Sequence, residues 1–136
     1  MQIHPLRLSP GRDLRAAIED ALRQRGSRAA FVLQGIGSLD VAQLRFAGAE
    51  APVSLRCDLE ILTLAGSVSL DGAHLHMSVS DVRGQVYGGH VASGCTVRTT
   101  AEILIALLPE HRFSREIDPD TGFKELVVHD ENGGAD

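Results

Sequence analysis

The sequence predicts an α+β fold built mainly on an antiparallel β-sheet, with two helices. Short apolar or alternating runs closed by glycine follow one another along most of the chain, and only two segments have helical character. Successive glycine-bounded runs are typical of antiparallel strands, whereas a βαβ protein alternates strands with helices. The length of 136 residues suits one domain with one core. We assign residues 1–130 to that domain and residues 131–136 to a flexible C-terminal tail.

The N-terminal part supplies a first strand and the clearer of the two helices. Residues 2–8, QIHPLRL, alternate weakly and predict a strand. Apolar residues then recur at helical spacing over residues 13–25, and Gly26 is well placed to end that helix. The next run, AAFVLQGIGSL, predicts a buried strand that leads into a glycine-containing bend.

The rest of the chain predicts further strands, a second helix and a closing hairpin. VAQLRFAG, VSLRCDLEILTLAGSVSL and AHLHMSVSD read as successive antiparallel strands. QVYGGHVASGCTV predicts a strand whose glycines mark bulges or close backbone contacts. Thr99 or Thr100 can cap a helix through AEILIALL, which Pro109 would stop. HRFSREIDPDTGFKELVVHD predicts a hairpin with DPDTG as its turn.

Composition and charge narrow the function classes. Apolar residues make up 43% of the chain and charged residues 23%, as in ordinary soluble domains. No apolar run is long enough to cross a membrane and the N-terminus lacks a signal-peptide layout, so we expect a cytoplasmic protein. Cys57 and Cys95 are then expected to be small buried apolar residues, not a disulfide. The formal net charge of -5, without a basic arm, argues against a nucleic-acid binder.

Three histidines in the stretch HLHMSVSDVRGQVYGGH form the candidate site. In a strand, His74 and His76 share one face with the serines, while the leucine, methionine and valine between them face the core. Asp81 and Gly84 stand where a type I turn prefers Asp first and Gly fourth. A three-residue loop over residues 82–84, with Gly84 left-handed, then places His90 directly opposite His76.

The register of this hairpin decides whether the three side chains meet. In the three-residue register His74 lies diagonal to His90, within reach of one shared ion. A two-residue loop, Arg83-Gly84, would instead put His90 opposite Met77 and turn it toward the core. A His-x-His pair on a strand is also often nothing more than polar sheet surface. Both alternatives stay open from the residues alone.

Three imidazoles define the kind of metal site that this hairpin would make. Neutral imidazole suits zinc, with iron, nickel, cobalt or copper as other choices. Three protein ligands leave one coordination position for water or substrate, as in catalytic zinc sites. His4, His111 and His129 stand alone in the sequence, and we interpret them as surface or strand residues.

The sequence resembles the PPC domain (plants and prokaryotes conserved domain), also called PD1-like, of the bacterial single-domain type. The stretches GIGSLDVAQLRFA and LEILTLAGSVSLDGAHLHMSVSDVRGQVYGGHVASGCTVRTTAEILI carry the resemblance, which runs from about residue 2 to residue 128. It implies an α+β fold assembled as a homotrimer, with a metal on His74, His76 and His90 in some members. Arg45 and Glu60 lie in its motifs. The two could pair at a subunit contact, or Glu60 could support a metal ligand or act as a general base.

Two functions follow from these observations. The first is a trimeric PPC-type binding or assembly module with a three-histidine transition-metal site, preferably zinc. Family members are often labelled DNA-binding, but the AT-hook that contacts DNA in plant members is missing here. The second is a small metal-dependent enzyme, in which metal-bound water attacks an unidentified small molecule. No catalytic residue can be named from the sequence.

Overall fold

The computed structural model describes residues 1–131, and the predicted flexible tail lies outside them apart from Glu131. The described part of the chain contains one helix and eight strands. Their bounds are β1 (Gln2–Leu8), α1 (Leu14–Gln24), β2 (Ala30–Arg45), β3 (Val53–Ser69), β4 (Gly72–Ser80), β5 (Val86–Val91), β6 (Thr96–Leu107), β7 (His111–Ile117) and β8 (Lys124–Asp130).

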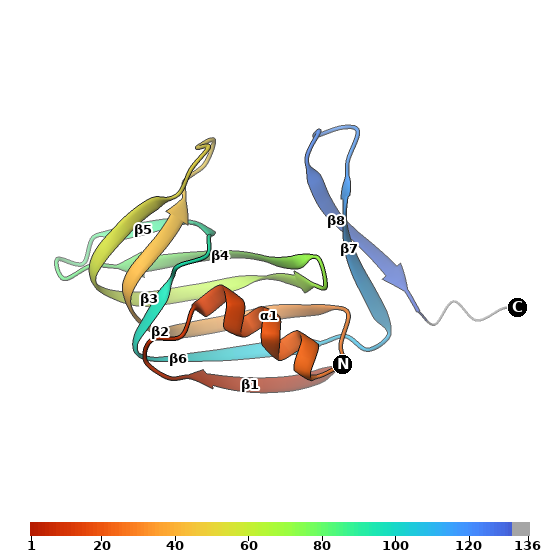
Figure 1. The fold of residues 1–136 in the computed structure, drawn as a ribbon, viewed down its shortest axis with the longest axis horizontal. Coiled ribbons are helices and arrows are strands. Elements are labelled where there is room, and N and C mark those ends of the chain that lie inside the picture. The colour runs from red at the N-terminus through yellow and green to blue at the C-terminus, as the bar shows by residue number, and fades with distance from the viewer. Residues whose placement is uncertain (132–136) are drawn as a thin grey trace, which may run out of the picture.

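Six strands form one antiparallel sheet in the order β1-β6-β2-β3-β4-β5. The end of β2 also pairs with β5, through Leu44 opposite Val91 and Arg45 opposite His90. This extra pairing curls the β2–β5 part of the sheet back on itself. Strands β7 and β8 form a separate hairpin that projects from the sheet, as Figure 1 shows. The prediction of a mainly antiparallel α+β fold with a closing hairpin is confirmed.

Helix α1 lies across one face of the sheet (Figure 1), where it packs against β3, β4 and β6. Asp13 caps its first turn by accepting a hydrogen bond from the Ala16 amide at 2.9 Å. Gly26 follows its last turn with a left-handed φ of 63°. Its buried stripe is the predicted one: Leu14, Ala17, Ile18, Ala21 and Leu22. In residues 1–131 the structure has no helix long and apolar enough to cross a membrane.

The predicted second helix is wrong, because all of AEILIALL except its last residue, Leu108, lies in strand β6. Ala101, Ile103 and Ile105 are buried, whereas Glu102 and Leu104 point to the other face. This alternation has the period of a strand. β6 also pairs on both sides, with β1 and with β2, so its backbone groups are satisfied by two neighbours. A short apolar run is compatible with either a helix or a strand. Here the pairing with two neighbouring strands makes it a strand.

The sheet face opposite α1 is apolar and uncovered. Cross-strand partners share a face, and the register places Ile3 and Phe31 opposite Ala106, and Ile36 opposite Glu102. Leu104 lies on the same side as Ala106 and Glu102. We call this surface, made of Ile3, Phe31, Ile36 and Leu104, the uncovered apolar face. The exposed fractions of these four side chains run from 37% to 50%.

Two local expectations need correction. The bend expected in AAFVLQGIGSL does not end the strand, because β2 continues for 16 residues, with its irregularities absorbed as register shifts against β6. Cys57 is exposed, whereas Cys95 is buried as expected, and both are free thiols. Cys57 lies on a stretch of β3 where its neighbours Arg56 and Asp58 are also exposed.

Candidate metal centre

Strand β4 separates its side chains as the sequence predicts. Leu75, Met77 and Val79 are buried in the core, at 0%, 4% and 0% exposure. His74 and His76 alternate with them and lie on the opposite face of the strand. Burial of the apolar set fixes which face the histidines occupy, because a strand cannot bury both faces of this sequence without burying the imidazoles.

The β4–β5 turn adopts the three-residue loop. The Asp81 amide donates to the Gln85 carbonyl at 3.0 Å, and the Gly84 amide donates to the Asp81 carbonyl at 3.0 Å. Gly84 has a φ of 76°, the left-handed conformation that this loop requires of its last residue. The Asp81 carboxylate also accepts from the backbone amides of Arg83 and Gln85. The turn is therefore fixed by backbone geometry and by the side chain of Asp81.

This turn sets the register in which His76 pairs with His90. Met77 lies opposite Gly89, so the alternative register with His90 beside Met77 is excluded. Gly89 also permits the pairing of β5 with β2, since a Cβ there would lie 2.7 Å from the Arg45 carbonyl oxygen. The close backbone contact expected from the Gly-Gly pair is confirmed.

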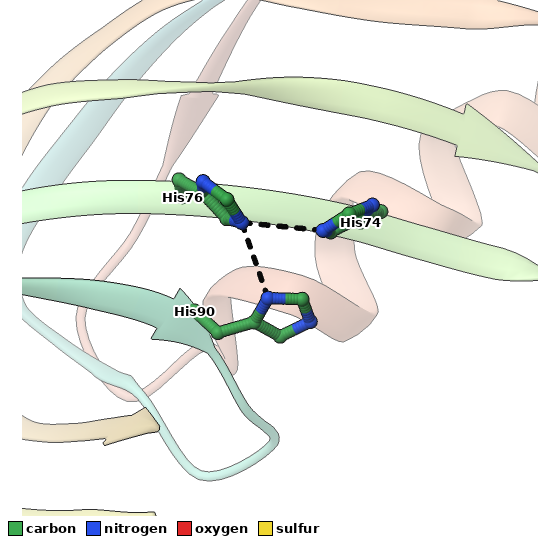
Figure 2. Close-up of side chains that lie close together, drawn as sticks. All are labelled: His74, His76 and His90. Carbon is green, nitrogen blue, oxygen red and sulfur yellow. Dashed lines mark hydrogen bonds between the residues drawn. The ribbon is translucent and has the colours of Figure 1, made fainter. Parts of the chain in front are cut away.

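The three imidazoles converge at one point, as Figure 2 shows. His74 Nε2 lies 3.2 Å from His76 Nε2, and His76 Nε2 lies 3.2 Å from His90 Nδ1. The three nitrogens all lie within 4.8 Å of one another. Ligands about 2.0–2.1 Å from a tetrahedral ion are about 3.3 Å apart, so two of the three separations already suit a zinc ion. The donor set and its spacing fit a transition metal.

Burial and nearby positive charge keep two of these rings neutral. Burial lowers the pKa of His90 to about 4, with further lowering by His74 and Arg45. Burial also lowers the pKa of His74, and the positive charge of Arg115 adds to this effect, while Glu125 opposes it. Metal coordination requires an unprotonated nitrogen, so both rings are ready to coordinate at neutral pH.

Arg45 and Glu60 have different surroundings. Arg45 is the cross-strand partner of His90, and its Nη1 donates to the Ala49 carbonyl at 3.3 Å. Glu60 lies opposite Ser38 and Ser80, and its Oε1 is 3.6 Å from Nη2 of Arg98. The structure therefore places Arg45 beside the histidines, and it brings Glu60 to Arg98 instead of Arg45.

A hollow of about 650 Å³ opens beside His74 and His90, and sequence reasoning missed most of its wall. The wall includes Arg115 of β7 and both Lys124 and Glu125 of β8. The Arg115 amide donates to Asp71 at 3.0 Å, and its Nη2 donates to Ser67 Oγ at 2.7 Å, which fixes the hairpin to the β3–β4 edge. No sequence signal indicates that the β7–β8 hairpin turns back to this edge.

The other three histidines are separate from the centre. His4 on β1 contacts Arg25 through Nδ1 at 2.7 Å. His111 and His129 lie on the β7–β8 hairpin, where His111 contacts Asp130 at 3.1 Å and His129 contacts Ser114 Oγ at 3.0 Å. None of the three belongs to the histidine cluster of the described residues.

Comparison with known proteins identifies close relatives. The family model of the Plants and Prokaryotes Conserved (PCC) domain matches residues 1–109. Over 128 residues, 94% of this chain, the sequence is 50% identical to the Bifunctional protein GlmU of Synechococcus sp. (strain JA-2-3B'a(2-13)). The chain spans only 20% of the length of that relative.

Solved structures share the fold over nearly the whole chain. A hypothetical protein from Salmonella cholerae-suis is 40% identical, with a TM-score of 0.92 and coverage of 95% of this chain and 94% of that one. The metal-containing protein AF0104 from Archaeoglobus fulgidus is 30% identical, with a TM-score of 0.76 and coverage of 93% and 94%. Two further proteins with this fold carry provisional DNA-binding descriptions.

Proposed function

The chain belongs to the Plants and Prokaryotes Conserved domain family, and on this basis we propose that it is a homotrimeric binding and assembly module with one transition-metal site. The metal ligands are His74, His76 and His90. One observation carries the proposal: three imidazole nitrogens from two paired strands lie within 4.8 Å of one another. Two of the three nitrogen separations are 3.2 Å, close to the spacing of ligands on one tetrahedral ion.

Zinc is the preferred ion. Three neutral imidazoles suit it, and their spacing is close to that of a tetrahedral zinc site. The Archaeoglobus fulgidus relative is a metal-containing protein, which supports a metal in this fold. Three protein ligands leave one position of a bound ion for water or another molecule.

The uncovered apolar face supports assembly into a trimer. Its four large side chains are exposed on a sheet whose other face is covered by α1. Apolar surface of this kind is usually buried against another chain. A homotrimer, the assembly that the family resemblance implies, would bury it.

DNA is a weaker candidate partner. The formal net charge is -5, and five of the thirteen basic residues form ion pairs with acidic ones in the described chain: Arg15, Arg23, Arg28, Arg98 and Arg112. Affinity for duplex DNA comes mainly from neutralised phosphates. We therefore expect weak binding with little dependence on sequence.

A metal-dependent enzyme is the second candidate function. The hollow beside His74 and His90 would give a small molecule access to the open position of a bound ion. Metal-bound water could then act as a nucleophile at neutral pH. Asp71 and Glu125 in the same wall are the acidic candidates for proton transfer, whereas Glu60 is held near Arg98.

The decisive experiment measures metal content. Wild-type protein purified without an affinity tag is loaded with zinc, dialysed and measured by inductively coupled plasma mass spectrometry. We expect one ion per chain in the wild type and almost none in His76→Ala, because His76 lies between the other two ligands. His129→Ala is the matched control and should keep the ion, since His129 bonds to Ser114 on another hairpin. Equal metal content in wild type and His76→Ala would exclude the site.

A further inference from the structure

We propose that the hollow beside the three histidines binds a small oxyanion, a carboxylate or a phosphate group, through Arg45 and Arg115. This oxyanion site rests on the proposed function in one respect, because the open position of a bound metal ion would hold a second oxygen of the same molecule. Binding of the oxyanion by the two arginines does not require the metal, so it can be tested on metal-free protein.

The hollow has the size and position of a small-molecule site. Its volume is about 650 Å³, within the range of roughly 300–1,000 Å³ that small-molecule pockets occupy. His74 and His90 form part of its wall, so a molecule inside it can reach the ligand cluster. The remaining wall comes from α1, the β2–β3 and β3–β4 connections and the β7–β8 hairpin.

The charge of the wall is opposite to that of the chain. Four basic side chains line the hollow, Arg15, Arg45, Arg115 and Lys124, against two acidic ones, Asp71 and Glu125. The whole chain has a formal net charge of -5. A concave site lined mainly by one sign of charge concentrates ions of the other sign.

Two of the guanidinium groups in this wall form no ion pair in residues 1–131. Arg15 is neutralised by Glu19 at 2.9 Å, but Arg45 and Arg115 donate only to neutral oxygens. Arg115 Nη2 donates to Ser67 Oγ, and Arg45 Nη1 donates to the Ala49 carbonyl. Each guanidinium has five N–H donors, so most of its donors stay free for a ligand.

The acidic side chains of the wall are engaged elsewhere. Asp71 accepts from the backbone amide of Arg115 at 3.0 Å, and Glu125 accepts from Thr121 Oγ1 at 3.1 Å. In the described part of the chain, neither Asp71 nor Glu125 forms an ion pair with Arg45 or Arg115. The positive charge of these two arginines is thus directed to the hollow without a carboxylate partner.

This arrangement matches an oxyanion better than a neutral molecule. A guanidinium binds carboxylate or phosphate oxygens through two parallel N–H···O bonds. Arg45 stands opposite His90, and Arg115 lines this hollow and also a second, neighbouring one that includes His74 and His76. An acid held by these arginines would present a second oxygen to a metal on the histidines, as small chelating acids do.

Calorimetry on metal-free and zinc-loaded protein tests the proposal. Sodium oxalate and inorganic phosphate are titrated at low ionic strength into the wild type, Arg45→Gln, Arg115→Gln and Arg23→Gln. Arg23 is the matched control, since it is an exposed arginine of α1 paired with Asp20. We expect saturable binding to the wild type and a loss of about tenfold or more in affinity in each of the first two variants, because a charge-assisted hydrogen bond is removed. Arg23→Gln should bind like the wild type.

The outcomes separate the two proposals. Preference for oxalate would assign a carboxylate ligand, and preference for phosphate would assign a phosphate ligand. Arginine-dependent binding of a probe, by a protein that takes up no zinc when zinc is supplied, would support the oxyanion site and overturn the metal site. Zinc binding without saturable binding of either probe, or equal affinities in all four proteins, would overturn the oxyanion site alone.

Discussion

At the scale of the residue, the lowered pKa of His90 determines how the proposed metal site responds to pH. Burial is the main cause of its lowered pKa, and the positive charges of His74, Arg45, His76 and Arg15 lower it further. Protons and metal ions compete for the same nitrogen, so a lower pKa in the metal-free protein weakens the competition from protons. A metal bound there would therefore meet competition from protons at His74 and His90 only in more acidic solution than an ordinary imidazole requires.

We therefore predict that zinc stays bound as the pH falls through the ordinary imidazole pKa of about 6.5. The pKa of His90 is about 4 and that of His74 is also lowered, so these rings take up protons only at lower pH. Affinity should then fall as the pH approaches about 4. The free zinc released from the loaded protein is measured with a chromophoric indicator as the pH is lowered. Complete release above pH about 6.5 would contradict the prediction.

The two thiols should differ in reactivity for a similar reason. Burial raises the pKa of Cys95 to about 11, so its reactive thiolate is scarce at pH 8 and its sulfur is shielded. Cys57 is exposed. We predict that a disulfide reagent labels Cys57 quickly in the native protein, and labels Cys95 only after unfolding. Labelling of native Cys57→Ser at the wild-type rate would contradict this assignment.

At the scale of the element, Gly66 determines how closely β3 approaches β4. Its φ is 153°, and a Cβ there would clash with the carbonyl oxygen of His74 and lie 2.8 Å from Cα of Leu75. We predict that Gly66→Ala lowers the free energy of unfolding by about 3 kcal/mol or more, from backbone strain and this clash. Urea unfolding measures the loss.

Gly88→Ala is the control for this prediction. A Cβ at Gly88 would meet only ordinary contacts, the nearest being the Met77 carbonyl oxygen at 3.4 Å. Gly88 also has no left-handed φ. The control should lose much less stability than Gly66→Ala, and similar losses in the two variants would show that the close approach of β3 and β4 does not matter.

Elements with local determinants could be predicted from the sequence, and those set by distant strands could not. The histidine hairpin depends on alternation in β4 and on the Asp81–Gly84 turn, so its register follows from neighbouring residues. Strand β6 contains good helix formers in AEILIALL, and its pairing with β1 and β2 overrides that preference. Arg115 reaches the site only because the β7–β8 hairpin docks on Asp71 and Ser67, far earlier in the chain.

At the scale of the whole molecule, the fold covers only one face of its larger sheet. Helix α1 packs on one side of the sheet, against β3, β4 and β6, and the uncovered apolar face lies on the other side. In residues 1–131 no second helix covers that face, and the β7–β8 hairpin, which projects from the sheet (Figure 1), contacts it through Phe113 on Phe31. The missing layer is expected to come from other copies.

We predict that the protein sediments as a trimer at micromolar concentration, and that the double variant Ile36→Glu/Leu104→Glu shifts it to the monomer. Both side chains belong to the uncovered apolar face, and a buried carboxylate without a partner is strongly unfavourable. Val82→Glu is the control, since Val82 is 77% exposed at the tip of the β4–β5 turn. A monomer mass for the wild type that does not change with concentration would refute the trimer.

The order of the strands also has a consequence for the time course of folding. β1 and β6 are adjacent in the sheet, although β1 ends at Leu8 and β6 begins only at Thr96, whereas all three histidines lie within residues 74–90. Closing a short hairpin takes microseconds, and long-range strand pairing takes milliseconds or more. The ligand cluster is therefore expected to assemble before the sheet is complete and before Arg45 and Arg115 arrive. An ion captured at that stage would guide the pairing of the remaining strands. Arg45 and Arg115 would reach the ion later, and only then could the site select its ligand.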